Sequence, residues 1–194
     1  MIIAVEGSIG SGKSTTASLL AKELSYSVLL EETERHPFLA DFYADPERNA
    51  LQTELAFLVI HYHQLVSQGK TAKVVMDFSP GKDLVFGRLN LHDGDLQLFE
   101  HVNRNLYNRV PTPDLAIFLD LPLRTLQHRI RQRGRPYEQR IPDSYLQSLR
   151  ESYLANFAEL AEAVEVLSVG ADDSVDVVAD RALGLVTRHL KLRS

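Results

Sequence analysis

The start of the chain joins an apolar run to a glycine-rich stretch and then to a helical pattern, an order that restricts the fold more than any other feature. Residues 2–5 read IIAV, residues 7–14 read GSIGSGKS, and residues 11–24 carry leucines at helical spacing. The central stretch fits the P-loop pattern G-x-x-x-x-G-K-[ST], whose glycines let backbone N–H groups approach an anion. The sequence therefore predicts a phosphate-binding loop between a strand and a helix.

Two side chains of this P-loop have specific expected roles. Lys13 would bridge the β- and γ-phosphates of a nucleoside triphosphate, and the Ser14 hydroxyl would hold Mg²⁺. The positive dipole end of the helix that begins near Lys13 would add to the attraction. A chance match on a Gly/Ser loop is the alternative, but the flanking strand and helix favour phosphate binding. The predicted nucleotide contacts are Gly7, Ser8, Ile9, Gly10, Ser11, Gly12, Lys13, Ser14 and Thr15.

The rest of the chain alternates short apolar runs with helical patterns. This alternation predicts an α/β fold, a doubly wound parallel sheet of five strands flanked by helices. No repeat, low-complexity tract or linker interrupts it, so we expect one domain over residues 1–194. Strands are predicted at 2–5, 73–78, 115–121 and 164–169 and just before Glu31, and helices at 11–24, 47–68, 142–164 and 174–192.

Composition excludes several classes of protein. A net charge of −5 argues against a partner that is a nucleic-acid polymer. The longest apolar run, residues 55–60, is too short for a membrane span, and the apolar start runs into glycines, unlike a signal peptide. The absence of cysteine fits a reducing, cytoplasmic setting. The seven histidines show no metal-ligand spacing, so the only metal expected is Mg²⁺ on the triphosphate.

An acidic residue ends the predicted strand at 73–78. The carboxylate of Asp77 would face the crevice where ligands bind, because that crevice lies at the carboxyl ends of parallel strands. It could complete the Mg²⁺ shell, as the Walker-B acid does. The alternative is a solvated turn, DFSPG, but the strand is otherwise wholly apolar, which favours a functional role.

Residues 128–140 concentrate positive charge. They contain five arginines and one acid, Glu138, and Gly134 and Pro136 interrupt the helical pattern. Arginine binds phosphate oxygens through paired, charge-assisted hydrogen bonds, so we expect a lid over residues 129–141 that closes on a triphosphate. A solvated basic face, or a patch for an acidic partner, is the alternative. The chain lacks the N-K-x-D and D-x-x-G motifs of a GTPase switch.

Several stretches together resemble a known family. They are GSIGSGKST, LEETERHPFL, FYADPERNALQTE, MDFSPGKD and RIRQRGRPYEQRIPDSYLQSL. They are similar to the deoxyribonucleoside kinases, especially the bacterial deoxyadenosine/deoxyguanosine kinase branch, and the likeness runs from the first strand to about residue 155. The resemblance implies a P-loop kinase fold, a homodimer, and transfer of the γ-phosphate of ATP to the 5′-hydroxyl of a deoxynucleoside. GTP as donor stays open.

The resemblance also assigns the phosphate-transfer residues. Glu31 matches the catalytic base, which accepts the proton of the attacking hydroxyl, although Glu31 and Glu32 alone would also fit a charged turn. Glu138 matches the acid that binds the 3′-hydroxyl. The catalytic set it implies is Glu31, Lys13, Arg129 and Asp77, with Arg129, Arg133 and Arg135 as phosphate contacts of the lid.

On the acceptor side the chain departs from better-known members. Tyr43 matches the sugar-binding tyrosine, and the same register puts Glu54 where a base-reading glutamine is usual. His61 then replaces an arginine seven residues later, on the same side of the helix. Read without the family, Glu54 and His61 would be a polar margin on a core helix. Gln52 is an alternative reader on another helical face.

The D/E-R-S motif of the family appears here as DFS. Phe78 replaces the arginine that helps at the acceptor end, and Lys82 is a nearby cation that could compensate. Asp83 matches the second acid of this region, near the base. The resemblance thus makes Phe78, Lys82 and Asp83 acceptor-site residues together with Tyr43, Glu54 and His61.

The identity of the base follows from Glu54. An ionised carboxylate only accepts hydrogen bonds, and guanine presents two adjacent donors, its N1–H and its 2-amino group. We therefore expect a purine deoxynucleoside, with deoxyguanosine slightly ahead of deoxyadenosine. This reasoning fails if Gln52 is the reader or if Glu54 is protonated.

Two other functions share the P-loop and the lid. A nucleoside monophosphate kinase, such as a thymidylate kinase, must hold a second phosphate, and Phe78 in place of an arginine argues mildly against it. A non-catalytic sensor of nucleoside triphosphates could dispense with Glu31 and the acceptor residues. Their presence in register favours an enzyme.

Overall fold

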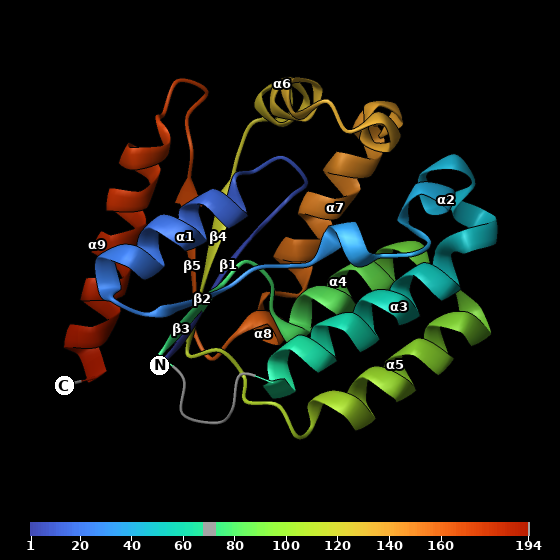
Figure 1. Ribbon diagram of the computed structural model, residues 1–194, viewed down its shortest axis with the longest axis horizontal. Coiled ribbons are helices and arrows are strands. Elements are labelled where there is room, and N and C mark those ends of the chain that lie inside the picture. Colours follow the sequence, from blue (N-terminus) through green and yellow to red (C-terminus); the bar gives the residue numbers. More distant parts are fainter. Residues whose placement is uncertain (68–72, 194) are drawn as a thin grey trace.

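Five parallel strands form the central sheet of the computed structural model, which describes residues 1–67 and 73–193 (Figure 1). The strand order is β2-β3-β1-β4-β5, with Ile3 of β1 beside Val75 and Leu115. The predicted five-stranded parallel sheet is confirmed. All carboxyl ends therefore lie at one edge, where the P-loop, Glu31 and Asp77 follow their strands. The strands are β1 (Ile2–Gly7), β2 (Ser27–Leu29), β3 (Val74–Met76), β4 (Leu115–Asp120) and β5 (Val164–Ser168).

Helices cover both faces of the sheet. Figure 1 shows α1 (Lys13–Leu24) and α9 (Val175–Arg193) on one face, and α4 (Pro80–Asn90) and α7 (Asp143–Ala155) on the other. Over the described residues, no helix combines the length and the apolar character that a membrane span requires. The remaining helices are α2 (Leu39–Ala44), α3 (Pro46–Ser67), α5 (Asp93–Tyr107), α6 (Leu123–Arg133) and α8 (Phe157–Leu160), with 3₁₀ turns η1 (Thr33–Arg35) and η2 (Pro136–Arg140).

The buried strands divide the core because successive side chains point to opposite faces of a sheet. In β4, Ile117 packs toward α1 and α9, whereas its neighbour Phe118 packs toward α4 and α7. A third apolar cluster joins α2, α3 and α5 and contains Phe42, Leu58 and Phe99. Two residues of this cluster, Phe42 and Tyr43, line the candidate site described below.

The helical predictions match the structure only in part. The helix predicted over 142–164 is interrupted at Asn156, which leaves helical geometry (φ −118°, ψ 23°) between α7 and the short helix α8. The prediction is wrong beyond residue 160, where the chain turns into β5. The helix predicted over 47–68 corresponds to α3, although residue 68 lies outside the described residues. Helices α2, α4 and α5 were not predicted from the sequence. The start of α4 could have been predicted, since Ser79 caps it and Pro80 occupies its first turn.

Candidate active site

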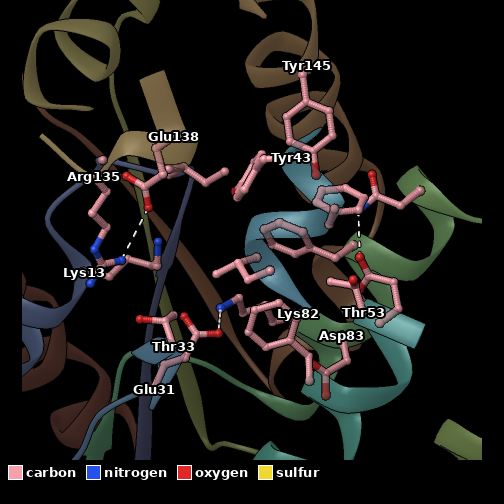
Figure 2. A pocket seen from close by; sticks show the side chains of 18 of the residues that line it. Lys13, Glu31, Thr33, Tyr43, Thr53, Lys82, Asp83, Arg135, Glu138 and Tyr145 are labelled. Carbon is pink, nitrogen blue, oxygen red and sulfur yellow. Dashed lines mark hydrogen bonds and ion pairs between the residues drawn. The ribbon is translucent and has the colours of Figure 1, made fainter. Parts of the chain in front are cut away.

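A cavity with an empty volume of about 720 Å³ opens at the carboxyl edge of the sheet. Figure 2 shows Lys13, Arg135 and Glu138 on one side of it and Thr53, Asp83 and Tyr145 on the other. Its wall contains the predicted residues Ile9, Gly10, Lys13, Glu31, Tyr43, Glu54, His61, Lys82, Asp83, Arg133, Arg135 and Glu138, and also Thr33, Leu39, Phe42, Thr53, Phe57, Phe86, Asn90 and Tyr145.

The P-loop bends tightly at one end of the cavity. Gly10 (φ 81°) and Gly12 (φ 93°) take left-handed conformations that favour glycine, and a Cβ on Gly10 would lie 2.9 Å from Ile130 Cγ1 of α6. The ammonium group of Lys13 donates to the carbonyl oxygens of Gly7 (3.0 Å) and Ser8 (3.1 Å). Burial, with the nearby charge of Lys82, lowers the pKa of Lys13 to about 8. The loop thus directs a half-buried cation toward the cavity.

Ile9 and Gly10 lie on the cavity wall, whereas the remaining P-loop residues lie around the Lys13 side chain. The side chains of Ser8 and Ser11 are buried, and their hydroxyls have no hydrogen-bond partner within the described part of the chain. Gly7 and Gly12 flank them, and the side chains of Ser14 and Thr15 are exposed at the start of α1.

Ser14 and Asp77 lie next to each other behind the P-loop. The Ser14 hydroxyl donates to Asp77 Oδ2, and Asp77 Oδ1 accepts from the backbone N–H of Glu31 (2.7 Å). A hydroxyl and a carboxylate are the oxygen ligands that Mg²⁺ prefers, so the donor set fits this ion. Within residues 1–67 and 73–193, no group of three or more histidines and acids could hold a metal ion by itself.

Glu31 is a carboxylate held by two cations. The Lys82 ammonium pairs with Oε1 of Glu31, and His61 Nε2 lies 2.9 Å from the same oxygen (Figure 2 labels Glu31 and Lys82). Burial opposes ionisation of Glu31, but Lys82 and His61 hold its pKa well below the ordinary value. Burial likewise opposes the charge on Lys82, and the Glu31 carboxylate raises the pKa of that ammonium. Glu31 is therefore ionised and oriented.

His61 joins Glu31 to a second acid. Its Nδ1 lies 2.7 Å from Asp83 Oδ1, and its ring is fully buried. Only an imidazolium can donate from both ring nitrogens to carboxylates. Burial opposes this protonation, but Asp83 and Glu31 raise the pKa of His61 to about 9. Tyr107 donates its hydroxyl to the other oxygen of Asp83.

Two predicted acceptor residues have contacts that the sequence did not indicate. His61 lines the cavity and pairs with Glu31 and Asp83, because acids lie within reach of both its ring nitrogens. Phe78 is fully buried, stacks on the His61 ring at 4.4 Å and does not line the cavity. Phe78 therefore supports the imidazolium from behind, and Lys82 supplies the cation beside Glu31.

The far end of the cavity is polar but carries no paired charge. Glu54 is 2% exposed, and its Oε1 accepts from the Asn90 side-chain amide at 2.8 Å. Burial, with a further contribution from the Asp83 charge, raises the pKa of Glu54 to about 8. Gln52 donates instead to Arg48 O and Asn49 Oδ1 and does not line the cavity.

The segment predicted as a lid crosses the P-loop end. Helix α6 ends at Gly134 (φ 69°), and Arg133 and Arg135 both pair with Glu138, which is 4% exposed. Arg129 donates to Ser11 O at 3.1 Å, so it rests on the P-loop itself. The Tyr43 and Tyr137 rings stack with centroids 5.7 Å apart and join this segment to α2. Arginines and an acid from one segment thus face the cavity together.

Asn90, Thr53 and Tyr145 are cavity residues that the sequence reading missed. Thr53 has a buried hydroxyl without a partner in the described part of the chain. Asn90 could have been predicted from the sequence, because the helix start signal at Ser79 and Pro80 places Asn90 two helical turns after Asp83, on the same side of α4. The sequence around Tyr145 has no motif that indicates a role in the site, because Tyr145 reaches the cavity only through the packing of α7 against α4.

The parallel sheet, the P-loop after its first strand and the cavity beside an arginine-rich segment define a P-loop kinase. Comparison with known proteins identifies the family. The family described as "Deoxynucleoside kinase" matches residues 3–188, so the chain belongs to the deoxynucleoside kinases and is an ATP-dependent phosphotransferase.

Individual relatives agree with this assignment. A deoxyguanosine kinase of Bacillus subtilis is 32% identical over 197 residues, 97% of this chain and 95% of its own length. A deoxyadenosine/deoxycytidine kinase of the same organism is 31% identical over 183 residues, 89% of this chain and 83% of its own. The structure of M. mycoides deoxyadenosine kinase with bound dATP superposes with a TM-score of 0.82 at 22% identity, covering 96% and 100% of the two chains. The last likeness is one of fold.

Proposed function

We propose that this kinase transfers the γ-phosphate of ATP to the 5′-hydroxyl of a purine deoxynucleoside, in nucleotide salvage. The observation that carries the proposal is the position of Glu31. Its ionised carboxylate lies in the same cavity as the P-loop Lys13 at one end and the polar side chains of Glu54 and Asn90 at the other. A nucleoside lying between these ends would present its 5′-hydroxyl to Glu31 and its base to Glu54.

The donor end would act mainly through charge. Lys13 would contact the β- and γ-phosphates, and Arg129, Arg133 and Arg135 would fold over them and exclude water. Ser14 and Asp77 would hold Mg²⁺, which when bound neutralises charge on the triphosphate.

The acceptor end would orient the attacking hydroxyl. Phosphoryl transfer passes through a loose transition state, so Glu31 needs chiefly to align the hydroxyl and to accept its proton as the new P–O bond forms. A carboxylate held ionised by Lys82 and His61 suits this task, because it is always ready to accept. Tyr43 and Glu138 would hold the sugar. Lys82, His61 and Asp83 act through Glu31, and Phe78 through His61.

The choice of a purine rests on Glu54. An ionised Glu54 would accept both guanine donors, and the relative with 32% identity is named a deoxyguanosine kinase. For the ionised form this places deoxyguanosine slightly ahead of deoxyadenosine, whereas the neutral form, which a pKa of about 8 favours at neutral pH, would match adenine instead. Gln52, the alternative reader, points away from the cavity.

The test offers the four deoxynucleosides and their monophosphates to the enzyme with ATP and Mg²⁺, and separates the products by chromatography. We expect phosphorylation of the purine deoxynucleosides. In the Glu31→Gln variant, kcat should fall by at least about 100-fold while ATP binding persists. Faster use of monophosphates would identify a monophosphate kinase instead. ATP binding without transfer to any acceptor would identify a sensor.

We also propose a homodimer, as the family resemblance implies. The exposed apolar side chains Val59 and Val66 of α3 and Leu98 of α5 support this, since α3 and α5 pack together. Light scattering in solution should give about twice the chain mass. A monomer at every concentration would contradict the proposal.

A further inference from the structure

The two carboxyl groups of the acceptor half of the cavity have opposite environments. Glu31 pairs with Lys82 and His61, whereas the hydrogen bond to Glu54 comes from the neutral amide of Asn90. Within the described residues, no lysine, arginine or histidine donates to Glu54. A carboxylate buried with one neutral donor is not strongly favoured over the neutral acid, so Glu54 can hold a proton where Glu31 cannot.

Charged groups on the neighbouring elements act in both directions on the ionisation of Glu54, so neither its carboxylate nor its neutral acid is strongly favoured. Besides burial, the Asp83 charge on α4 favours the neutral acid, and Lys82 on α4 and His61 on α3 favour the carboxylate. Tyr145 of α7 also faces Glu54, and burial raises the pKa of its phenol, so it is neutral there. The resulting pKa of Glu54, about 8, makes both protonation states accessible near neutral pH.

The two states of Glu54 offer different hydrogen bonds to a base. The carboxylate accepts twice and matches the N1–H and 2-amino donors of guanine. The neutral acid has one donor and one acceptor, which matches N1 and the 6-amino group of adenine. Because Asn90 donates to Oε1, the proton of the neutral acid belongs on Oε2, so Asn90 fixes which oxygen donates.

We propose that Glu54 and Asn90 form a proton-switched base reader, which takes adenine when Glu54 is neutral and guanine when it is ionised. This inference rests on the proposed function, because it requires that the base of the acceptor lies at Glu54. It assigns to Asn90 a positioning role, and it makes the preference between two purine deoxynucleosides depend on pH.

The size of the effect does not depend on the pKa itself. The ratio of ionised to neutral Glu54 rises tenfold for each pH unit, and each base binds one form. The ratio of kcat/KM for deoxyguanosine to that for deoxyadenosine should therefore rise by up to about tenfold per unit, or about 100-fold over two units. Titration of Lys13 or His61 alters phosphate transfer to both acceptors alike, so it cancels in this ratio.

The experiment is a competition in one vessel. Equal concentrations of the two purine deoxynucleosides, with ATP and Mg²⁺, are incubated with the enzyme at several values between roughly pH 6 and 8, where the ordinary ionisations of the bases do not interfere. The ratio of dGMP to dAMP at low conversion gives the ratio of kcat/KM. We expect it to rise steeply with pH.

Three variants locate the effect. Glu54→Gln keeps one donor and one acceptor at every pH, so its product ratio should be flat and favour dAMP. Gln52→Ala changes a neighbour outside the cavity and should keep the wild-type slope. Asn90→Asp places a second acid beside Glu54, and because like charge raises a carboxyl pKa, the pH of equal products should move upward.

The outcomes separate this inference from the proposed function. A flat product ratio in an active wild-type enzyme would overturn the proton switch alone. The same slope in Glu54→Gln, or an unshifted crossover in Asn90→Asp, would also overturn it. If neither purine deoxynucleoside is phosphorylated at any pH, the proposed function fails instead. Should Glu54→Gln not fold, the Asn90→Asp crossover still decides.

Discussion

His61 gives the sharpest prediction about how the buried charges stabilise this kinase. Its folded pKa of about 9 exceeds the ordinary 6.5, so the proton it carries stabilises the folded state by up to about 3 kcal/mol. Because the folded pKa is the higher one, this contribution is complete below pH 6.5 and is lost as the pH rises through about 9. Replacing His61 by glutamine should remove this pH dependence.

The assay is urea unfolding of the wild type and of His61→Gln at roughly pH 6.5 and pH 9.5. Between these values the wild type should lose about 3 kcal/mol more of its unfolding free energy than the variant. Lys13 titrates in the same window with the opposite sign, since its folded pKa is lowered to about 8, but it is present in both proteins and cancels. The matched control is His63→Gln, an exposed histidine on the same helix, which should behave as wild type. Equal pH dependence in the wild type and His61→Gln would refute the assignment of an imidazolium.

Two further predictions concern packing and the sugar site. A Cβ on Gly81 would lie 2.0 Å from the Glu159 carbonyl oxygen, whereas one on Gly184 of α9 meets nothing within 4 Å. Gly81→Ala should therefore destabilise the fold by about 2 kcal/mol or more in thermal or urea unfolding, and Gly184→Ala should stabilise it by about 0.5–1 kcal/mol; equal effects would contradict this packing. Glu138→Gln removes the acid that pairs with Arg133 and Arg135, so the KM for the deoxynucleoside should rise about tenfold in steady-state kinetics, and an unchanged KM would exclude Glu138 from the sugar site.

The arrangement of the proposed donor end could be predicted from the sequence because its geometry is local. The strand, the glycines and Lys13 follow one another in the chain, and backbone conformation alone brings them together. Asp77 was also predictable, since a residue after a parallel strand lies at the ligand-binding edge whatever the details of packing.

The hydrogen bonds of the proposed acceptor end could not be predicted in the same way, because they join side chains of different helices that are far apart in the sequence. The partners of His61 are an acid after β2 and an acid on α4, and their distances depend on how α3 packs against α4. The protonation of Glu54 depends on burial by the same packing and on Asn90, at the end of a helix that the sequence reading did not assign. Family register placed Glu54 and His61 in the cavity, but it could not give their hydrogen bonds.

The central claim is that Lys13 and Glu31 serve one cavity in which a triphosphate and a nucleoside meet. The most direct measurement compares ATP affinity by calorimetry and phosphorylation of deoxyguanosine in the wild type and in Lys13→Ala. We expect clearly weaker ATP binding and a kinase rate reduced by at least about 100-fold in Lys13→Ala, since a half-buried cation aimed at the phosphates is removed. Full ATP affinity together with the full kinase rate in Lys13→Ala would contradict it.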